Sequence, residues 1–429
     1  MKKKQLNIAI VGLGNIGLYF YSYLKKNQSL LEKKTNSKPN IYGLSANNIR
    51  KKRKITIPKK LWFKNYLDAA KSPNVDIIVE LIGGSEGPAK KLVYTALQNK
   101  KHVVTANKAL IAKHGDSLSL IAEKNKVNLE FEAAVCGGVP VIRSIKEGLI
   151  ANSINKVQGI LNGTSNYILS SMEKENISFN NALINAQKLG YAEANPYSDL
   201  NGDDVSSKLK ILSSLSFNSR LNHQIYVEGI NHIDQLDIIN ASKFGYKIKL
   251  MGVAELKNNK LIQRVHAAFI KKVSYIASID GVLNAVIIDG SPVGSSVIQG
   301  EGAGPEATTS ALISDISSIL RGNVKYPFAI SSVERKKIKI DPIINQSFSC
   351  YFRIDVKDKH GVLSNITKIF AKNKVSIKRL IQNPFRSKKN SSIVIITHKA
   401  KDKNLNKILN QISRKKFIIN KPKFIRIED

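Results

Sequence analysis

The stretch LNIAIVGLGNIGLYFYSYL, residues 6–24, decides the fold of the first part of the chain. Its apolar run predicts a buried strand over residues 6–11, then a turn and a helix from about Ile16. The turn has the spacing G-x-G-x-x-G, with glycines at Gly12, Gly14 and Gly17. In a dinucleotide-binding turn the first glycine permits the tight bend, the second lets backbone approach a pyrophosphate, and the third lets helix and strand pack closely. We therefore expect a dinucleotide here; a glycine turn that binds no nucleotide is the alternative.

The next segments continue an alternation of strand and helix. Strand patterns cover residues 39–46 and 75–84, a helix pattern covers 87–100, and 101–112 reads as a strand followed by a turn with Asn107 and Lys108. This alternation predicts an α/β fold with a Rossmann-type, doubly wound parallel sheet. Ligands of such sheets bind at the carboxyl ends of the strands, where Ile82, Gly83 and Thr105 fall.

The residues after the second strand bear on the choice of cofactor. An NAD site often places an acid there for the ribose 2′-hydroxyl. Here Ser45, Asn47 and Asn48 are followed by the basic run Arg50, Lys51, Lys52 and Arg53. Cations at this position can hold a 2′-phosphate, so the sequence favours NADP(H) over NAD(H). A general basic bias is the alternative explanation.

Composition limits the class of protein. A length of 429 residues predicts two or three domains. The sequence contains no run of about 18 apolar residues, so a transmembrane helix is not expected. Only Cys136 and Cys350 are present and the start of the chain has no cleavage site, so we expect a cytosolic protein without disulfides or membrane attachment. The net charge of +36 comes from lysines spread over every segment, which indicates compositional bias rather than a nucleic-acid partner.

Seven stretches follow one another between about Leu6 and Pro327: GLGNIG, VELIGG, VVTANKALIA, FEAAVCGGVPVI, GILNGTSNYIL, KLGYAEANPYSDLNGDDVSSKLKIL and GEGAGPEATTSALISDI. In this order they resemble the homoserine dehydrogenases. The resemblance implies interconversion of L-homoserine and L-aspartate 4-semialdehyde by a nicotinamide cofactor, in threonine, methionine and isoleucine biosynthesis. Kinase motifs are absent, so the fused aspartokinase form is not expected. The cofactor-binding positions implied are Gly12, Leu13, Gly14, Asn15, Ile16, Gly17, Arg50, Ile82, Gly83, Thr105, Lys108 and Gly302.

The acidic segment over residues 193–208 is unusual in so basic a chain. Asp203 or Asn201 predicts an N-cap, and Asp204 and Lys208 share one face of the following helix. A surface pair at that spacing contributes only about 0.3 to 0.5 kcal/mol and needs no further carboxylates, whereas a substrate with an α-ammonium does. By the resemblance, Glu193 binds the amino group, and Asp199 and Asp204 are the remaining homoserine ligands.

The resemblance also implies that Lys208 handles the hydroxyl proton. A lysine with its free pKa of about 10.4 is a poor base at neutral pH, so we expect burial or a second cation, Lys108, to lower the pKa of Lys208. A solvated helix lysine is the alternative. Gly163 and Thr164 lie at a predicted strand end and helix start, and a plain helix cap is as good an interpretation of them as a substrate contact.

The stretch FEAAVCGGVPVI reads as an apolar strand that enters a glycine turn. Glu132 as an acid catalyst and Cys136 as a nucleophile are conceivable, but no histidine accompanies Cys136, so we expect a buried thiol. The family resemblance implies a monovalent cation, Na⁺, bound through backbone carbonyls, and carbonyl oxygen suits such a hard ion. The matching positions are Glu132, Val135, Gly137 and Val139.

The C-terminal part changes character after a basic linker over residues 331–347. Its pattern predicts βαββαβ and resembles an ACT domain, with the turn D-x-x-G-V-L at Asp358–Leu363. ACT domains pair side by side and bind amino acids, so L-threonine is the expected effector; an assembly module without a ligand is the alternative.

The expected domains are a Rossmann domain (1–136, completed by 305–330), an α+β substrate and dimerisation domain (137–304) and the ACT domain (348–429), in a homodimer or homotetramer. Competing functions are another Rossmann-fold amino-acid dehydrogenase and a non-catalytic amino-acid-sensing ACT protein.

Overall fold

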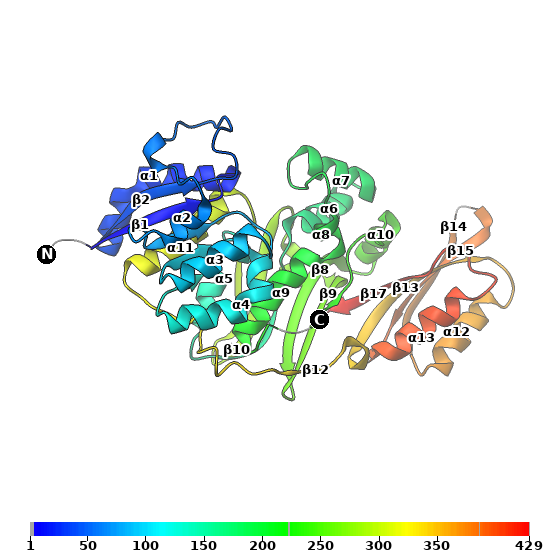
Figure 1. Cartoon of the computed structure of the whole chain (residues 1–429). Helices are drawn as coiled ribbons and strands as arrows, with labels where there is room; N and C mark the ends of the chain where they lie inside the picture. Colours follow the sequence, from blue (N-terminus) through cyan, green and yellow to red (C-terminus); the bar gives the residue numbers. More distant parts are fainter. Residues whose placement is uncertain (1–3, 222–223, 386, 429) are drawn as a thin grey trace.

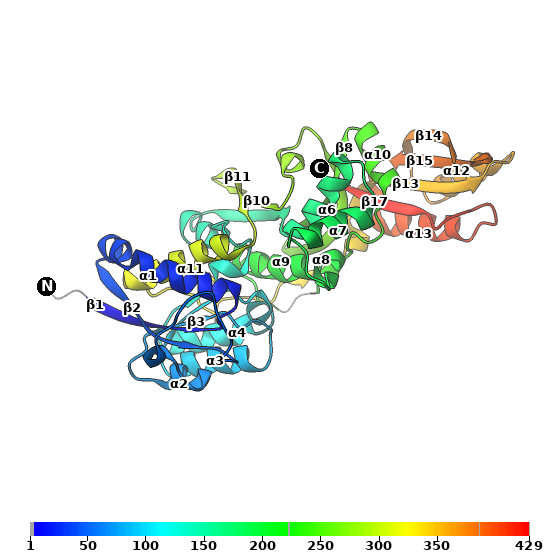
Figure 2. The same ribbon diagram turned by 90° about the horizontal axis from the view of Figure 1, so that it is seen from above.

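Three parts of the chain lie in a row in the computed structural model, which describes residues 4–221, 224–385 and 387–428. The glycine-turn part is at one end, the acidic helix is in the middle, and the last 80 or so residues form the other end (Figures 1 and 2). Within these ranges no helix combines the length and the apolar run that crossing a membrane requires.

The first part is a five-stranded, all-parallel sheet of order β2-β1-β3-β4-β5. Its strands are β1 (Lys4–Val11), β2 (Ser37–Ser45), β3 (Ile77–Glu80), β4 (His102–Thr105) and β5 (Leu129–Glu130). Helices α1 (Asn15–Thr35) and α11 (Pro305–Leu320) cover one face, while α3 (Pro88–Gln98) and α4 (Lys108–Lys124) cover the other (Figure 2). Alternate residues of β1 serve the two faces: Ile8 and Ile10 pack with α1 and α11, and Ala9 and Val11 with α3 and α4. The predicted doubly wound sheet is confirmed, and its last helix returns from far along the chain.

The middle part is an antiparallel sheet of order β11-β10-β6-β8-β9. Its strands are β6 (Ser153–Ile160), β8 (Tyr246–Lys257), β9 (Lys260–Lys271), β10 (Leu283–Ser291) and β11 (Gly294–Glu301). The helices of this part are α6 (Gly163–Lys174), α7 (Phe179–Lys188), α8 (Tyr197–Asn201), α9 (Asp203–Ser216) and α10 (Gln235–Lys243). Val205 and Leu209 of α9 pack over Gly252 of β8, which fixes the acidic helix against the sheet.

The C-terminal part has the predicted βαββαβ order. It contains β13 (Ser347–Lys357), α12 (Val362–Lys372), β14 (Ile377–Phe385), β15 (Ser387–Thr397), α13 (Asp402–Ser413) and β17 (Lys423–Glu428), with a short β16 (Ala400–Lys401). Phe352 of β13 packs against Phe370 of α12 and Phe424 of β17. Both helices lie on one face of the sheet (Figure 1).

The sheets of the middle and C-terminal parts are one sheet. Strand β17 pairs in parallel with β9, from Arg426 opposite Ala268 to Glu428 opposite Ile270. The same edge of β9 also receives β7 (Tyr226–Val227) and β12 (Lys339–Ile340), each as a short parallel strand. Nothing in the sequence pattern predicted this junction.

The predicted linker contains little regular secondary structure, but its side chains bind to the rest of the molecule. Besides β12 it holds a 3₁₀ turn, η5 (Ile343–Asn345), and Arg335, which is only 2% exposed. The Arg335 guanidinium donates to the carbonyl of Ser219 and forms an ion pair with Asp116 at 2.8 Å. The linker is therefore anchored to both of the preceding parts.

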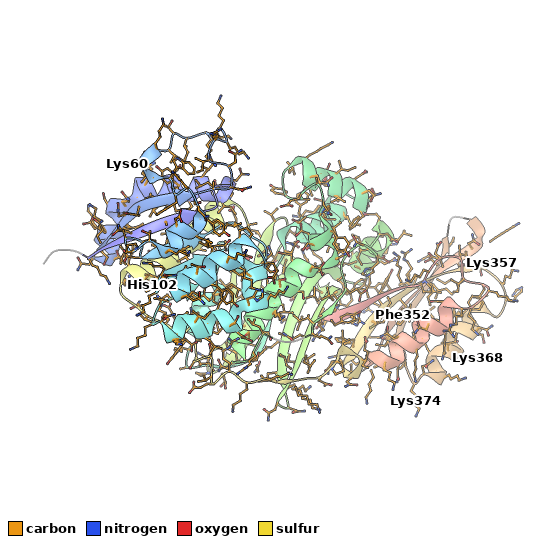
Figure 3. The ribbon with its side chains drawn as sticks, in the orientation of Figure 1. Lys60, His102, Phe352, Lys357, Lys368 and Lys374 are labelled. Carbon is orange, nitrogen blue, oxygen red and sulfur yellow. The ribbon has the colours of Figure 1, made fainter. Side chains whose placement is uncertain are left out.

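Lysine side chains lie over the whole molecule. Figure 3 labels exposed lysines at opposite ends, with Lys60 in the first part and Lys357, Lys368 and Lys374 in the last.

Candidate active site

The glycine turn has the shape that a pyrophosphate needs. Gly12 has φ of 105°, and a Cβ there would lie 2.4 Å from the carbonyl oxygen of Leu81. A Cβ on Gly17 would lie 2.0 Å from the carbonyl oxygen of Gly12, so this glycine lets α1 approach the strand. A Cβ on Gly14 would meet no atom within 4 Å, so the backbone there is open to a ligand at the N-terminus of α1. The three glycines fit the group that the motif implies.

A cavity of about 720 Å³ adjoins this turn and runs past the end of β2. Its lining includes Gly12, Leu13, Gly14, Ser45, Asn47, Lys51, Arg53 and Ile82. Arg50, which the sequence analysis selected, is exposed and is not among the lining residues. Arg53 lies over the Trp62 ring at 5.0 Å and donates to the carbonyls of Asn48 and Ile49. The structure therefore places Lys51 and Arg53, rather than Arg50, at the cavity.

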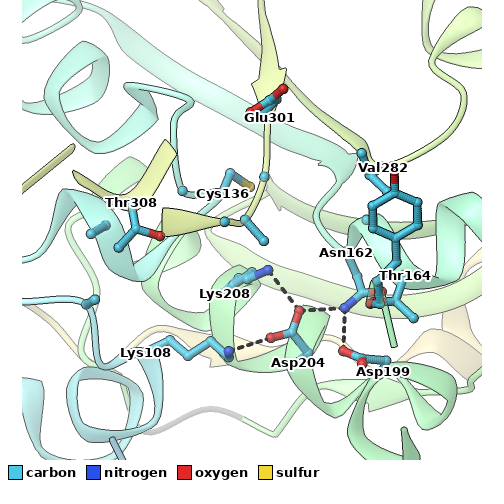
Figure 4. A pocket seen from close by; sticks show the side chains of 18 of the residues that line it. Lys108, Cys136, Asn162, Thr164, Asp199, Asp204, Lys208, Val282, Glu301 and Thr308 are labelled. Carbon is cyan, nitrogen blue, oxygen red and sulfur yellow. Dashed lines mark hydrogen bonds and ion pairs between the residues drawn. The ribbon is translucent and has the colours of Figure 1, made fainter. Parts of the chain in front are cut away.

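A second cavity, of about 570 Å³, lies between the first and middle parts of the chain. Ile16, Ala106 and Lys108 come from the first part, and Asn162, Asp199, Asp204 and Lys208 come from the middle part. Lys108 points toward Asp204 in this cavity (Figure 4). Of the predicted site residues, it brings together Ile16, Lys108, Gly137, Gly163, Thr164, Asp199, Asp204, Lys208 and Gly302.

Asp204 joins the two lysines of this cavity. Its Oδ1 lies 2.8 Å from Nζ of Lys108, and its Oδ2 lies 2.8 Å from Nζ of Lys208 (Figure 4). Nζ of Lys208 also donates to the carbonyl oxygen of Leu161 at 2.6 Å. Burial disfavours the Asp204 carboxylate, but Lys208 and Lys108 outweigh this and hold the pKa of Asp204 well below its usual range. One carboxylate thus serves lysines from two parts of the molecule.

The expected lowering of the Lys208 pKa is wrong for this arrangement. Burial disfavours the ammonium, but the charge of Asp204, one helical turn away, together with that of Asp199, outweighs it and raises the pKa of Lys208. Lys108 does not repel Lys208 across an open space, because Asp204 lies between them. Lys208 is therefore held as an ammonium before any substrate enters. At 8% exposure it is also not the solvated lysine that the sequence left open.

The predicted N-cap of the acidic helix is also wrong. Asp203 is the first residue of α9 and Asn201 is the last of α8, so the cap is Gly202. Gly202 has φ of 87°, and a Cβ there would lie 3.1 Å from the side chain of Val265. A single residue turns the chain between two helices here, and only glycine takes that conformation without strain.

Two predicted substrate contacts, Thr164 and Glu193, differ in their position: only Thr164 lines the cavity. The hydroxyl of Thr164 donates to the carbonyl of Tyr191 at 2.6 Å, which ties the start of α6 to the turn before the acidic segment. Glu193 is exposed and does not line the cavity; its carbonyl accepts from the side chain of Gln187. The arrangement therefore does not bring Glu193 to the other acids.

The stretch from Glu132 differs from the expected strand. Strand β5 ends at Glu130, and residues Glu132–Ala134 form the 3₁₀ helix η2, because the buried Glu132 carboxylate turns back to accept from the backbone N–H groups of Ile142 (2.9 Å) and Arg143 (2.7 Å). Burial raises the pKa of Glu132 to about 7. The Cys136 thiol is fully buried, so the buried thiol that the sequence predicted is confirmed, and burial raises its pKa.

The four predicted cation positions surround one tight turn. Cys136 and Gly137 both have positive φ, of 56° and 45°, and a Cβ on Gly137 would lie 2.6 Å from the carbonyl of Gly302. Within the described ranges no three His, Cys, Asp or Glu side chains gather to hold a metal. Ligation by the carbonyls of Glu132, Val135, Gly137 and Val139 stays a prediction.

Comparison with known proteins decides the family. The model of the family described as "Homoserine dehydrogenase" matches residues 140–317, "Homoserine dehydrogenase, NAD binding domain" matches 12–132, and "ACT domain" matches 351–416. Homoserine dehydrogenase of Neisseria gonorrhoeae is 37% identical over 94% of each chain, and that of Helicobacter pylori is 37% identical over 100% of each. The chain belongs to the homoserine dehydrogenase family.

Solved homoserine dehydrogenases have the same architecture. The enzyme from Thiobacillus denitrificans superposes with a TM-score of 0.93 at 35% identity, and that of S. aureus at pH 7.5 with 0.76 at 31% identity; each comparison covers 99% of both chains. The homoserine dehydrogenase match includes all three parts, so this chain is an oxidoreductase with an ACT domain and not a freestanding amino-acid sensor.

Sequence reasoning missed two buried side chains that shape this homoserine dehydrogenase site. Glu80 ends β3, is 0% exposed, and accepts from the N–H groups of Ile82 (2.7 Å) and Gly83 (3.0 Å) and from the Thr105 hydroxyl (2.5 Å). It therefore fixes the turns that follow β3 and β4, the first of which lines the cavity beside the glycine turn through Ile82. The other is Asn162, which is 4% exposed and donates hydrogen bonds to Asp199 and Asp204. A signal existed for both, because each is a polar residue at the carboxyl end of an apolar strand.

Proposed function

We propose that this chain catalyses the NAD(P)-linked interconversion of L-homoserine and L-aspartate 4-semialdehyde. The observation that carries the proposal is the bridge of Asp204 between Lys108 and Lys208, with Asp199 beside it, in a cavity that Ile16 of the glycine-turn helix also lines. Carboxylates next to lysines can receive the α-ammonium and the hydroxyl of one small amino acid. The cytosol, as for other enzymes of amino-acid biosynthesis, is the proposed location.

Each residue then has a part in the reaction. Asp199 and Asp204 bind the substrate ammonium, with Glu193 as a further ligand by the family pattern. A nicotinamide cofactor supplies the hydride acceptor for oxidation and the hydride donor for reduction. Lys208 gives its proton to the aldehyde oxygen during reduction and takes the hydroxyl proton during oxidation. Gly163 and Thr164 close the substrate side of the cavity.

The arrival of substrate changes the charges around Lys208. In the structure Asp204 raises the pKa of Lys208, which suits a proton donor. A substrate ammonium that binds Asp204 competes with both lysines for the carboxylate and adds a positive charge. Both effects lower the pKa of Lys208 towards the range in which it can also act as a base.

The finer assignments belong to the same proposal. Preference for NADP(H) over NAD(H) is supported by Lys51 and Arg53 at the cavity beside the glycine turn. The backbone carbonyls of Glu132, Val135, Gly137 and Val139 would hold Na⁺. The proposed domains are residues 1–136 with 305–330, 137–304, the linker 331–347 and the ACT domain 348–429; residues 1–3 and 429 lie outside the described part. A homodimer or homotetramer is supported by the outermost strands of the large sheet, β11 and β14, which offer edges for a second copy.

Steady-state assays test the proposal directly. L-homoserine oxidation is measured with NADP⁺ and with NAD⁺, and L-serine, one methylene shorter, is the control substrate. We expect activity with both cofactors on L-homoserine and a higher kcat/KM for NADP⁺. No turnover of L-homoserine contradicts the function, whereas a tenfold preference for NAD⁺ contradicts only the 2′-phosphate assignment. A single sedimenting monomer at micromolar concentration contradicts the oligomer.

A further inference from the structure

We propose that Asn162 is a positioning residue: its amide holds Asp199 and Asp204 together as one receptor for the substrate ammonium. Nδ2 of Asn162 donates to Oδ1 of Asp199 at 2.7 Å and to Oδ2 of Asp204 at 2.9 Å (Figure 4). The inference rests on the proposed function, because it assigns this cluster to the substrate ammonium. It adds a residue that acts through the two carboxylates and not on the reacting atoms.

Both ends of the amide are in use. Its oxygen accepts from the N–H of Ser165 at 2.8 Å, so Asn162 also caps α6, and its two N–H groups go to the two carboxylates. The residue is 4% exposed. A side chain fixed at both ends in this way holds its partners at one separation.

Charge explains why a neutral donor is needed between the two acids. Two carboxylates that converge on one site repel each other, and proximity of this kind raises the pKa of one of them. Burial raises the pKa of Asp199 and Asp204 raises it further, whereas the hydrogen bond from Asn162 and the charges of Lys208 and Lys108 lower it. The amide therefore favours the ionised form of both acids without contributing a positive charge that would compete with the substrate ammonium.

The neighbouring residue links the same point to the proton donor. Leu161 precedes Asn162, and its carbonyl accepts from Nζ of Lys208 at 2.6 Å. The end of β6 thus fixes the lysine through one residue and both acids through the next. Asn162 sets the distance between the ammonium receptor and the group that exchanges the hydroxyl proton.

Two substitutions separate this role from the helix cap. Serine is a good N-cap but has no amide to bridge the acids, so Asn162→Ser keeps the cap and removes the bridge. Asn162→Asp keeps the shape and the cap but replaces two donors by a third negative charge. Ser178→Ala, which removes the cap of α7 in the same part of the chain, is the control for loss of a cap alone.

The measurements are KM for L-homoserine, the pH dependence of kcat/KM, NADPH binding by fluorescence, and Tm, all on the full chain. We expect both Asn162 variants to raise KM by about 10- to 100-fold, as for loss of a hydrogen bond to a charged group. In Asn162→Asp the acid limb of kcat/KM should move to higher pH, because the added charge raises the carboxylate pKa values. NADPH binding should be unchanged, and Ser178→Ala should change only Tm.

The inference is overturned if Asn162→Ser keeps KM within threefold of the unsubstituted chain, or if the acid limb of Asn162→Asp does not move. If Asn162→Ser does not fold, the pH dependence of kcat/KM in Asn162→Asp alone decides whether the inference stands. A chain that binds NADPH but does not oxidise L-homoserine before any substitution contradicts the proposed function instead, so the two failures are distinguishable.

Discussion

Arg426 of the ACT strand β17 forms an ion pair of 2.9 Å with Glu228, which directly follows β7 in the middle part. Two residues after Glu228, the N–H of Ile230 donates to the carbonyl of Leu200 at 2.8 Å. Leu200 is the neighbour of Asp199 in α8. A short path of direct contacts therefore runs from the ACT domain to a carboxylate of the catalytic cavity.

If L-threonine is the effector, Glu228→Gln should weaken its effect on activity. The substitution keeps the size of the side chain but removes the charge that Arg426 contacts. We expect wild-type kcat/KM without threonine, unchanged threonine binding by calorimetry, and loss of most of an allosteric coupling that usually amounts to about 1 to 3 kcal/mol. The exposed Glu334→Gln is the control. An unaltered threonine response rules out this path.

A point substitution is preferable to a chain that ends near Ser331, because the shorter chain would also lack β12 and β17, which pair with β9.

Lys208→Ala should lower kcat by about 10² to 10⁴, the range for loss of a general acid or base, with a much smaller change in KM for homoserine. The physical reason is that Lys208 is the buried ammonium at the cavity, while Asp204 keeps Lys108 as a partner. Lys210→Ala, two residues along α9 and outside the cavity lining, is the control. A raised KM with intact kcat would make Lys208 a binding residue and Lys108 the better candidate for proton transfer.

Asp199→Asn and Glu193→Gln test which acids bind the ammonium. We expect both to raise KM for homoserine, because each removes a carboxylate from the substrate amino group. The larger rise should follow Asp199→Asn, since Asp199 already lines the cavity and Glu193 does not. An effect of Glu193→Gln requires the segment 190–196 to close over the substrate. No change in KM from Glu193→Gln would remove Glu193 from the site.

Arg53→Ala and Lys51→Ala should each raise KM for NADP⁺ by about tenfold or more and leave KM for NAD⁺ nearly unchanged, because NAD⁺ has no 2′-phosphate for a cation to bind. Arg50→Ala is the matched comparison, since its side chain is exposed and outside the cavity lining. The result that would restore the original choice of Arg50 is a larger loss of NADP⁺ affinity from Arg50→Ala than from either of the other two.

Glu428 should make the ACT junction sensitive to acid. Burial disfavours its carboxylate, but Arg264 (2.5 Å) and His266 (2.9 Å) outweigh this and hold the pKa of Glu428 well below its usual range. A depressed folded-state pKa contributes stability above the unfolded value of about 4.3, and that stability is lost as the pH falls through the folded value.

Glu428→Gln, which leaves Arg264 buried without its charge partner, should cost about 3 to 5 kcal/mol at pH 7, and the difference from the unsubstituted chain should shrink below about pH 4. Denaturant unfolding at pH 7 and at pH 3.5 measures it, with Glu334→Gln as the control. A difference that is the same at both pH values contradicts the ion-pair explanation.

Local patterns gave the correct fold of each part because each depends on neighbouring residues. The glycine spacing, the alternation of strands and helices and the four-residue step from Asp204 to Lys208 all act over short stretches. The pairing of Lys108 with Asp204 is different. The sequence analysis expected Lys108 only as a second cation near Lys208, and the packing of α4 against α9 brings Lys108 to Asp204.

The errors also have physical causes. Asp203 looked like a cap because an acid before an apolar stripe usually is one, but α8 ends at Asn201, two residues before Asp203, and the turn between the two helices falls on Gly202. The Lys208 pKa was misjudged because the sequence does not show that Asp204 separates the two lysines. The pairing of β17 with β9 left no local sign, since an alternating strand pattern does not specify its neighbour.

Three strands from different places in the chain, β7, β12 and β17, pair with one edge of β9. The ribosome synthesises β17 long after β9. Arg264 and Glu428, which join across that edge, are 164 residues apart. At ribosomal rates of about 5 to 20 residues per second, β9 emerges on the order of 10 to 30 s before β17 is available. During that interval the nascent chain exposes unpaired strand groups that another molecule could capture. A premature stop or proteolytic nick before Lys423 would make this exposure permanent, so truncated chains should be found mainly in aggregates.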